Sequence, residues 1–142
     1  MTAAPVADQR PPAPEPTPPF PRRIEGTSRG ERWELTTSSS GVVATTGHGP
    51  VAQALVTERG EQVVVELWTA LGPLPAPVRA GLVAEAFAHP AVRIRRPVLA
   101  VVPRGNSDLL DAVRTRVGGA SSRVAGVTCL IEGHVGAARP TG

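Results

Sequence analysis

The sequence contains no lysine and no tyrosine, a single cysteine, and few aromatic residues, which make up 3% of the chain. One cysteine excludes an internal disulfide and leaves the redox compartment open. No run of about 18 apolar residues is present, which excludes a membrane-spanning helix. The first residues also lack the basic start and apolar run of a secretory signal. We therefore expect a cytoplasmic protein with no membrane partner.

All 15 basic residues are arginines, against 12 acidic residues, which gives a formal net charge of +3. Arginine in place of lysine, together with abundant Ala, Val, Gly and Pro, is typical of the codon bias of a GC-rich bacterial genome. Arginine content is therefore weak evidence for arginine-specific recognition. The segment 93–123 nevertheless holds seven arginines and two aspartates, a local charge of 7 − 2 = +5. These arginines are Arg93, Arg95, Arg96, Arg104, Arg114, Arg116 and Arg123.

The 142 residues are enough for one domain. Eight of the 16 prolines lie within the first 21 residues, where sizeable apolar side chains are rare. Such a segment cannot bury enough surface to offset the entropy of ordering it. We therefore expect a disordered tail over 1–31, a single folded domain over 32–136 and a disordered end over 137–142. The tail is either a spacer or a polyproline ligand of an SH3-type groove.

Alternating apolar and polar residues predict a set of antiparallel strands between Arg32 and Ala70. In the last of these, from Gln62 to Ala70, one face is fully apolar, whereas Val64, Glu66 and Trp68 make the other face mixed. We expect a helix to cover part of this mixed face.

A helix is predicted over 78–88, with Pro77 in its first turn, where a missing N–H costs nothing. A buried strand, Val98–Val102, and an amphipathic helix, Leu109–Val117, follow it, and the region Val124–Val135 predicts a last strand. The strands Gln62–Ala70 and Val98–Val102, joined through one helix, should run parallel. The fold class is therefore α+β (mixed α/β): an antiparallel meander, then helix–strand–helix–strand, on a mixed sheet of five to six strands.

The turn Arg104, Gly105, Asn106, Ser107 joins the carboxyl end of the buried strand to the start of the second helix. Ligands of open α/β sheets sit at such places, and backbone N–H groups with an arginine suit an anion. These four residues are our candidate binding site, for a small anionic ligand. Asn106 or Ser107 is the expected N-cap, and Asp108 lies at the same positive helix end.

This order of elements resembles the core of the GNAT-type N-acetyltransferases over roughly residues 32–135. The resemblance implies an acetyl-CoA pyrophosphate held by a Gln/Arg-x-x-Gly-x-Gly/Ala segment at the start of the first helix. The matching stretch here is Leu74-Pro-Ala-Pro-Val-Arg79, in which Pro75 and Pro77 remove N–H donors. The motif is absent, and we predict no cofactor. Asn106 stands where members of that family often carry an asparagine that faces the cofactor.

No other motif predicts a catalytic or metal site. The three histidines, His48, His89 and His134, are far apart, and Cys129 stands in an apolar run. The segment Ser38–Gly41, with His48 and Glu66, supplies the residue types of a nucleophilic site but no nucleophile-elbow motif.

Three functions therefore stay open. The first is a non-catalytic binding or regulatory module with an unknown protein partner. The second is a small acyltransferase-like or nucleotide-handling enzyme with an unrecognised anion site. The third is a weak nucleic-acid binder that uses the segment 93–123, although this segment contains no aromatic residue for stacking.

Overall fold

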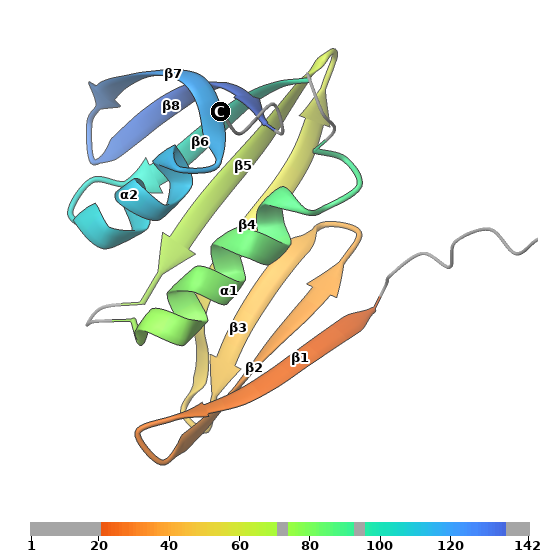
Figure 1. Cartoon of the computed structure of the whole chain (residues 1–142), viewed down its shortest axis with the longest axis vertical. Coiled ribbons are helices and arrows are strands. Elements are labelled where there is room, and N and C mark those ends of the chain that lie inside the picture. The colour runs from red at the N-terminus through yellow and green to blue at the C-terminus, as the bar shows by residue number, and fades with distance from the viewer. Residues whose placement is uncertain (1–20, 71–73, 93–95, 136–142) are drawn as a thin grey trace, which may run out of the picture.

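The computed structural model describes residues 21–70, 74–92 and 96–135. Within these ranges the chain forms eight strands and two helices (Figure 1). In chain order they are β1 (Arg22–Ser28), β2 (Glu31–Ser38), β3 (Gly41–Thr46), β4 (Gly49–Arg59), β5 (Gln62–Thr69), α1 (Ala76–Phe87), β6 (Pro97–Pro103), α2 (Ser107–Arg114), β7 (Val117–Ala125) and β8 (Thr128–Val135).

All eight strands belong to one mixed sheet in the order β1-β2-β3-β4-β5-β6-β8-β7. The first five form an antiparallel meander, as the alternating sequence predicts. The predicted parallel pair is confirmed: β5 and β6 pair through Val63–Glu66 and Val98–Val101, with α1 as the crossover between them. The α+β class is therefore correct, whereas the expected sheet of five to six strands is too small.

The two strands that the sequence does not reveal are the edge strands of the sheet. Strand β1 lies inside the segment that composition assigns to the tail, and its one sizeable apolar residue, Ile24, packs against the core. Strand β7 is mostly polar, and its Gly118 stands where the sequence predicts the end of the second helix. That helix in fact ends at Arg114. An edge strand pairs on one side only, so a weak apolar pattern suffices to hold it. The tail prediction for residues 1–20 and the prediction for 137–142 lie outside the described residues.

Both helices pack on the same face of the sheet, in front of the strands in Figure 1. Helix α1 crosses β2, β3 and β4, while α2 lies against β6 and β7. The core between the layers is built from alternate residues of each strand, such as Leu35, Val65 and Val98, with Leu82 of α1 and Leu109 of α2. Every one of these five side chains is almost completely buried.

The close approach of α1 to β2 depends on Gly81. A Cβ atom added to Gly81 would lie 2.6 Å from Cδ1 of Leu35, which is itself buried. A glycine in a helix costs up to about 1 kcal/mol relative to alanine. Here the missing side chain allows α1 to pack closely against β2.

The opposite face of the sheet carries no helix among the described residues. The face of β5 formed by Val64, Glu66 and Trp68 points to this side, away from the core that contains Val63, Val65 and Leu67. The expectation that a helix partly covers the mixed face is therefore wrong. Alternation along one strand shows that a strand has two unlike faces, but not which one the helices cover.

Among the described residues, no helix has the length and apolar character required to cross a membrane.

Candidate functional site: the open face of the sheet

We call the side of the sheet that faces away from both helices the open face. The strand register sets its side chains in rows across the sheet. In one row Leu55 stands opposite Glu66, which stands opposite Val101, which stands opposite Leu130. In the row on one side Val64 neighbours Leu99, and in the row on the other side Trp68 neighbours Gln53, which neighbours Val43. An apolar stripe therefore runs over five adjacent strands. Glu66 lies within it, and Glu132, which stands opposite Leu99 on β8, lies at its edge.

The stripe is the part of this face with the largest exposed apolar side chains. Trp68 is 50% exposed and Leu55 is 37% exposed, whereas Val64 is only 7% exposed. Large exposed apolar residues are unusual when they gather on one surface rather than occurring singly. An aromatic anchor within an aliphatic surround is the arrangement that dominates the energetics of protein interfaces.

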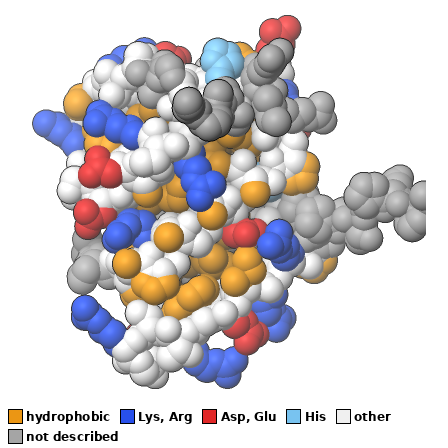
Figure 2. Space-filling model, in the orientation of Figure 1, with side chains coloured by type: hydrophobic (Ala, Val, Ile, Leu, Met, Phe, Trp, Pro, Cys, Tyr) orange, Lys and Arg blue, Asp and Glu red, His pale blue; other side chains and the backbone are white. Residues whose placement is uncertain are grey.

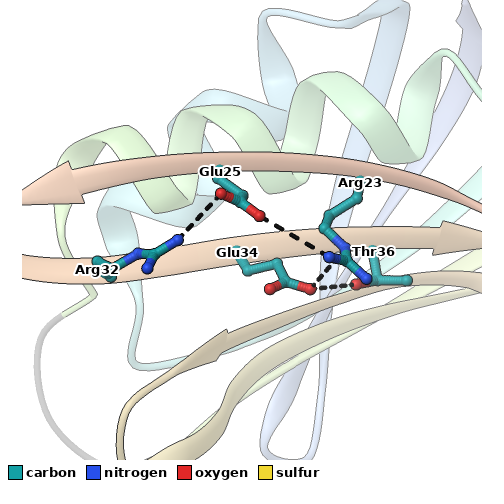
Figure 3. A network of polar contacts seen from close by, with 5 residues as sticks. All are labelled: Arg23, Glu25, Arg32, Glu34 and Thr36. Carbon is teal, nitrogen blue, oxygen red and sulfur yellow. Dashed lines mark hydrogen bonds and ion pairs between the residues drawn. The ribbon is translucent and has the colours of Figure 1, made fainter.

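Charged side chains border the stripe, and most of them are paired within the chain. Figure 3 shows the network on β1 and β2, on the side away from α1. Arg23 Nε lies 3.1 Å from Glu34 Oε2, and Arg32 Nη2 lies 3.1 Å from Glu25 Oε1. At the other end of the sheet Arg123 Nη1 lies 3.6 Å from Glu132 Oε1. An apolar centre with a polar, charge-balanced rim is the anatomy of a protein–protein contact surface.

The predicted anion site forms the turn between β6 and α2, and its groups are largely engaged in holding that turn. Asn106 Oδ1 accepts a hydrogen bond from the Leu109 N–H at 3.0 Å, so Asn106 rather than Ser107 is the N-cap. Arg104 donates from its backbone N–H to the Val127 carbonyl at 2.8 Å and from Nη1 to the Gly126 carbonyl at 3.4 Å. Gly105 and Ser107 are exposed. The turn is thus tied to the β7–β8 turn, and Asn106 already satisfies one free helix donor.

The two helices start close to each other, a proximity that the sequence does not show. Arg79 Nη1 of α1 lies 3.8 Å from Asp108 Oδ2 of α2. The Asp108 carboxylate therefore stands at the positive end of α2, where an anionic ligand would otherwise be favoured.

The arginines of the segment 93–123 do not form one patch among the residues that the structure describes. Arg96 binds the β4–β5 turn, Arg104 reaches the β7–β8 turn, and Arg114 Nη2 donates to Ser122 Oγ at 2.9 Å. Arg123 lies on the open face in its pair with Glu132. On the helix side, basic side chains are scattered among acidic and neutral ones (Figure 2).

The structure does not bring together the residue types of a nucleophilic site. His48 stands on the β3–β4 turn beside Glu31, with Nε2 3.5 Å from Oε2, at the opposite end of β3 from Ser40. Glu66 lies on the open face of β5. Within the described ranges there is also no group of three or more His, Cys, Asp or Glu residues that could hold a metal ion.

His89 lies close to the turn between β2 and β3, which holds Ser39 and Ser40, and the sequence has no signal for this proximity. It is almost fully buried at the end of α1 and borders a hollow of about 530 Å³. The hollow is lined by Ser39, Ser40, Val56, Thr57, Glu58, His89, Pro90 and Ala91. The His89 ring accepts at Nδ1 from the Ala91 N–H at 3.1 Å. Its Nε2 therefore carries the proton and donates to the Ser38 carbonyl at 3.0 Å. Both nitrogens are used in backbone contacts, which suits a structural role.

The chain matches no protein-family model, no curated protein and no solved structure.

Proposed function

We propose that this chain is a non-catalytic binding or regulatory module, and that the open face of its sheet is the surface that contacts a protein partner. The observation that carries the proposal is the exposed apolar stripe around Trp68 and Leu55, which no described element of the chain covers. Burying such a stripe contributes roughly 25 cal/mol for each Å² of apolar surface removed from water. The charged side chains of the rim would fix the register and orientation of the bound partner.

A second candidate is a small acyltransferase-like or nucleotide-handling enzyme. It is favoured by one observation: the starts of α1 and α2 meet, through Arg79 and Asp108, beside the parallel strands β5 and β6. Ligands of open α/β sheets sit beyond the carboxyl ends of such strands. Against it, Pro75 is the N-cap of α1 and Pro77 lies in its first turn, which deletes donors where a pyrophosphate would be held.

The two candidates differ in what they expect of small anionic ligands. A thermal-shift titration with acetyl-CoA, nucleotides and phosphate separates them. The enzyme candidate expects a rise in Tm that Arg104→Ala abolishes, because a ligand that binds the native state stabilises it. The binding-module proposal expects no rise with any of these compounds.

Nucleic-acid binding is the weakest of the three proposals. The described arginines of segment 93–123 lie on different sides of the fold, and Arg123 and Arg96 are paired with Glu132 and Glu58. Phosphate-driven binding needs cations gathered on one surface. The proline-rich residues 1–20 lie outside the described structure, and their role as a spacer or groove ligand stays a prediction.

The experiment that tests the proposed surface is site-specific photo-crosslinking in the cells that make the protein. A photoreactive residue replaces Gln53, which lies beside Trp68 on the open face, and in a control it replaces Val127, which is 81% exposed on the β7–β8 turn. We expect a discrete protein adduct from position 53 and none from position 127. Equal adduct formation at both positions, or none at position 53, would contradict the proposal.

A further inference from the structure

We propose that the partner of the open face is a second copy of this chain, which packs sheet against sheet to form a two-fold dimer. This inference rests on the proposed function, because it names the occupant of the same surface. A dimer of this kind is isologous: the same patch of both subunits meets itself, so the patch must be complementary to itself in size and charge.

The dimensions of the stripe favour a broad partner. It crosses β3, β4, β5, β6 and β8, which are neighbours in the sheet. Strands lie about 4.8 Å apart, so the stripe is roughly 20 Å wide. The three rows of the stripe are two residues apart, so it also extends over roughly 13 Å along the strands. A helix about 10 Å across that lies along the rows would therefore leave the outer rows partly in water, and an added strand about 5 Å across would leave most of the stripe in water. A second sheet face of the same dimensions covers all of it.

The whole open face also has the size that a stable interface needs. Eight strands and about six residues of each give a plane of roughly 34 by 20 Å, or about 700 Å². A standard interface buries about 800 Å² on each partner. Sheets that stack face to face, about 10 Å apart, form their core from inner faces of this kind.

The charge of the face suits a copy of itself and suits a strongly charged partner poorly. Most of its charges are matched within the chain, as in the pairs Arg23–Glu34 and Arg123–Glu132, and the exposed Arg59 at the end of β4 is balanced in number by Glu66. A second copy therefore meets no excess of like charge, and a polyanion finds no excess cation.

Glu66 is the exception on this surface, since it is exposed within the apolar stripe. The two-fold axis must keep the two Glu66 carboxylates apart and set each against polar groups of the other subunit, such as Gln53 or Thr57, which stands opposite Val64 on this face. Removing this charge by Glu66→Gln keeps the size of the side chain and lowers the cost of desolvating it. The dimer is therefore expected to tighten in that variant.

Sedimentation velocity of the full chain over a wide concentration range tests the inference. The wild type is expected to pass from monomer to dimer as the concentration rises. Trp68→Glu should weaken the dimer by more than about tenfold, because it replaces an interface anchor with a buried charge. Glu66→Gln should strengthen it several-fold. Val127→Glu, an equally drastic change of an exposed apolar residue away from the open face, should leave it unchanged.

A wild type that stays monomeric at every concentration would overturn the inference, as would equal weakening by Trp68→Glu and Val127→Glu. The failure of the dimer and the failure of the proposed function are distinguishable by the mass of the adduct at position 53. An adduct of twice the chain mass supports the dimer. An adduct with a different protein overturns the dimer and leaves the open face as the binding surface. The absence of any adduct overturns both.

Discussion

His89 and Ser38 are 51 residues apart in the chain, yet the His89 ring donates from Nε2 to the Ser38 carbonyl across 3.0 Å. The bond ties the end of α1 to the turn between β2 and β3. The other ring nitrogen, Nδ1, accepts from the Ala91 N–H and so also fixes the segment that leaves the helix. One buried side chain thus joins three parts of the helix layer and the sheet.

We predict that His89→Ala lowers the free energy of unfolding by about 1–3 kcal/mol, because it leaves two partly buried backbone groups, the Ser38 carbonyl and the Ala91 N–H, without their partners. Chemical denaturation measures the loss. His48→Ala is the matched control, since His48 is an exposed histidine on the β3–β4 turn. It should change stability by less than about 0.5 kcal/mol. Equal effects of the two substitutions would show that the His89 contacts contribute nothing to stability.

Gly81→Ala is expected to destabilise the protein by about 1–2 kcal/mol, although alanine is the better helix former by about 1 kcal/mol. The added methyl group meets Leu35 Cδ1 in a packed core. In a Leu35→Ala background, which removes that atom, the same substitution should stabilise the protein. Thermal or chemical unfolding of the four proteins of this double-mutant cycle measures the reversal of sign. Stabilisation by Gly81→Ala in the wild type would show that the space between α1 and Leu35 accommodates a methyl group.

Asn106→Ala should cost about 1 kcal/mol of stability, because Asn106 Oδ1 caps α2 through the Leu109 N–H. Ser107→Ala, one position further along, should cost only a few tenths of a kcal/mol. Urea denaturation of the two variants compares these costs. A larger loss of stability from Ser107→Ala than from Asn106→Ala would show that Ser107, and not Asn106, caps α2.

Arg96→Lys is predicted to cost about 1–3 kcal/mol, because lysine cannot reproduce a guanidinium that serves several acceptors at once. Arg96 donates to the carbonyls of Gly60, Glu61 and Ala91 at 3.1–3.2 Å and pairs with Glu58 at 3.0 Å. Its side chain is only 17% exposed. Arg116→Lys, at an exposed arginine just after α2, is the control and should be neutral. Calorimetric unfolding measures Tm for both variants. An equal fall in Tm would contradict the stabilising role given to the Arg96 guanidinium.

The strong local patterns of the sequence predict the central part of the fold. Alternation from Gln62 identifies β5, Pro77 marks the first turn of α1, and the apolar run at Val98 gives β6. The parallel pairing of β5 with β6 follows because one helix joins them. The edge strands escape prediction because an edge strand needs little apolar pattern, as the polar sequence of β7 shows.

The candidate surface could be predicted only in part. The mixed character of Val64, Glu66 and Trp68 is visible in the sequence, but the side that the helices choose depends on contacts such as that of Gly81 with Leu35, 46 positions earlier in the chain. The stripe itself depends on the register of five strands. The pairing of His89 with Ser38 has no local signal at all, since neither residue belongs to a motif.

The accessibility of Trp68 tests most directly the claim that the open face is a covered contact surface. Trp68 is half exposed in the single chain, whereas the Trp33 indole nitrogen is buried, so Trp33 serves as an internal reference. Hydroxyl-radical footprinting measures the ratio of Trp68 to Trp33 oxidation, first in cells that make the protein and then in the purified chain at high dilution. We predict that Trp68 is protected in cells and becomes reactive on dilution. Equal and high oxidation of Trp68 in both conditions would contradict the account.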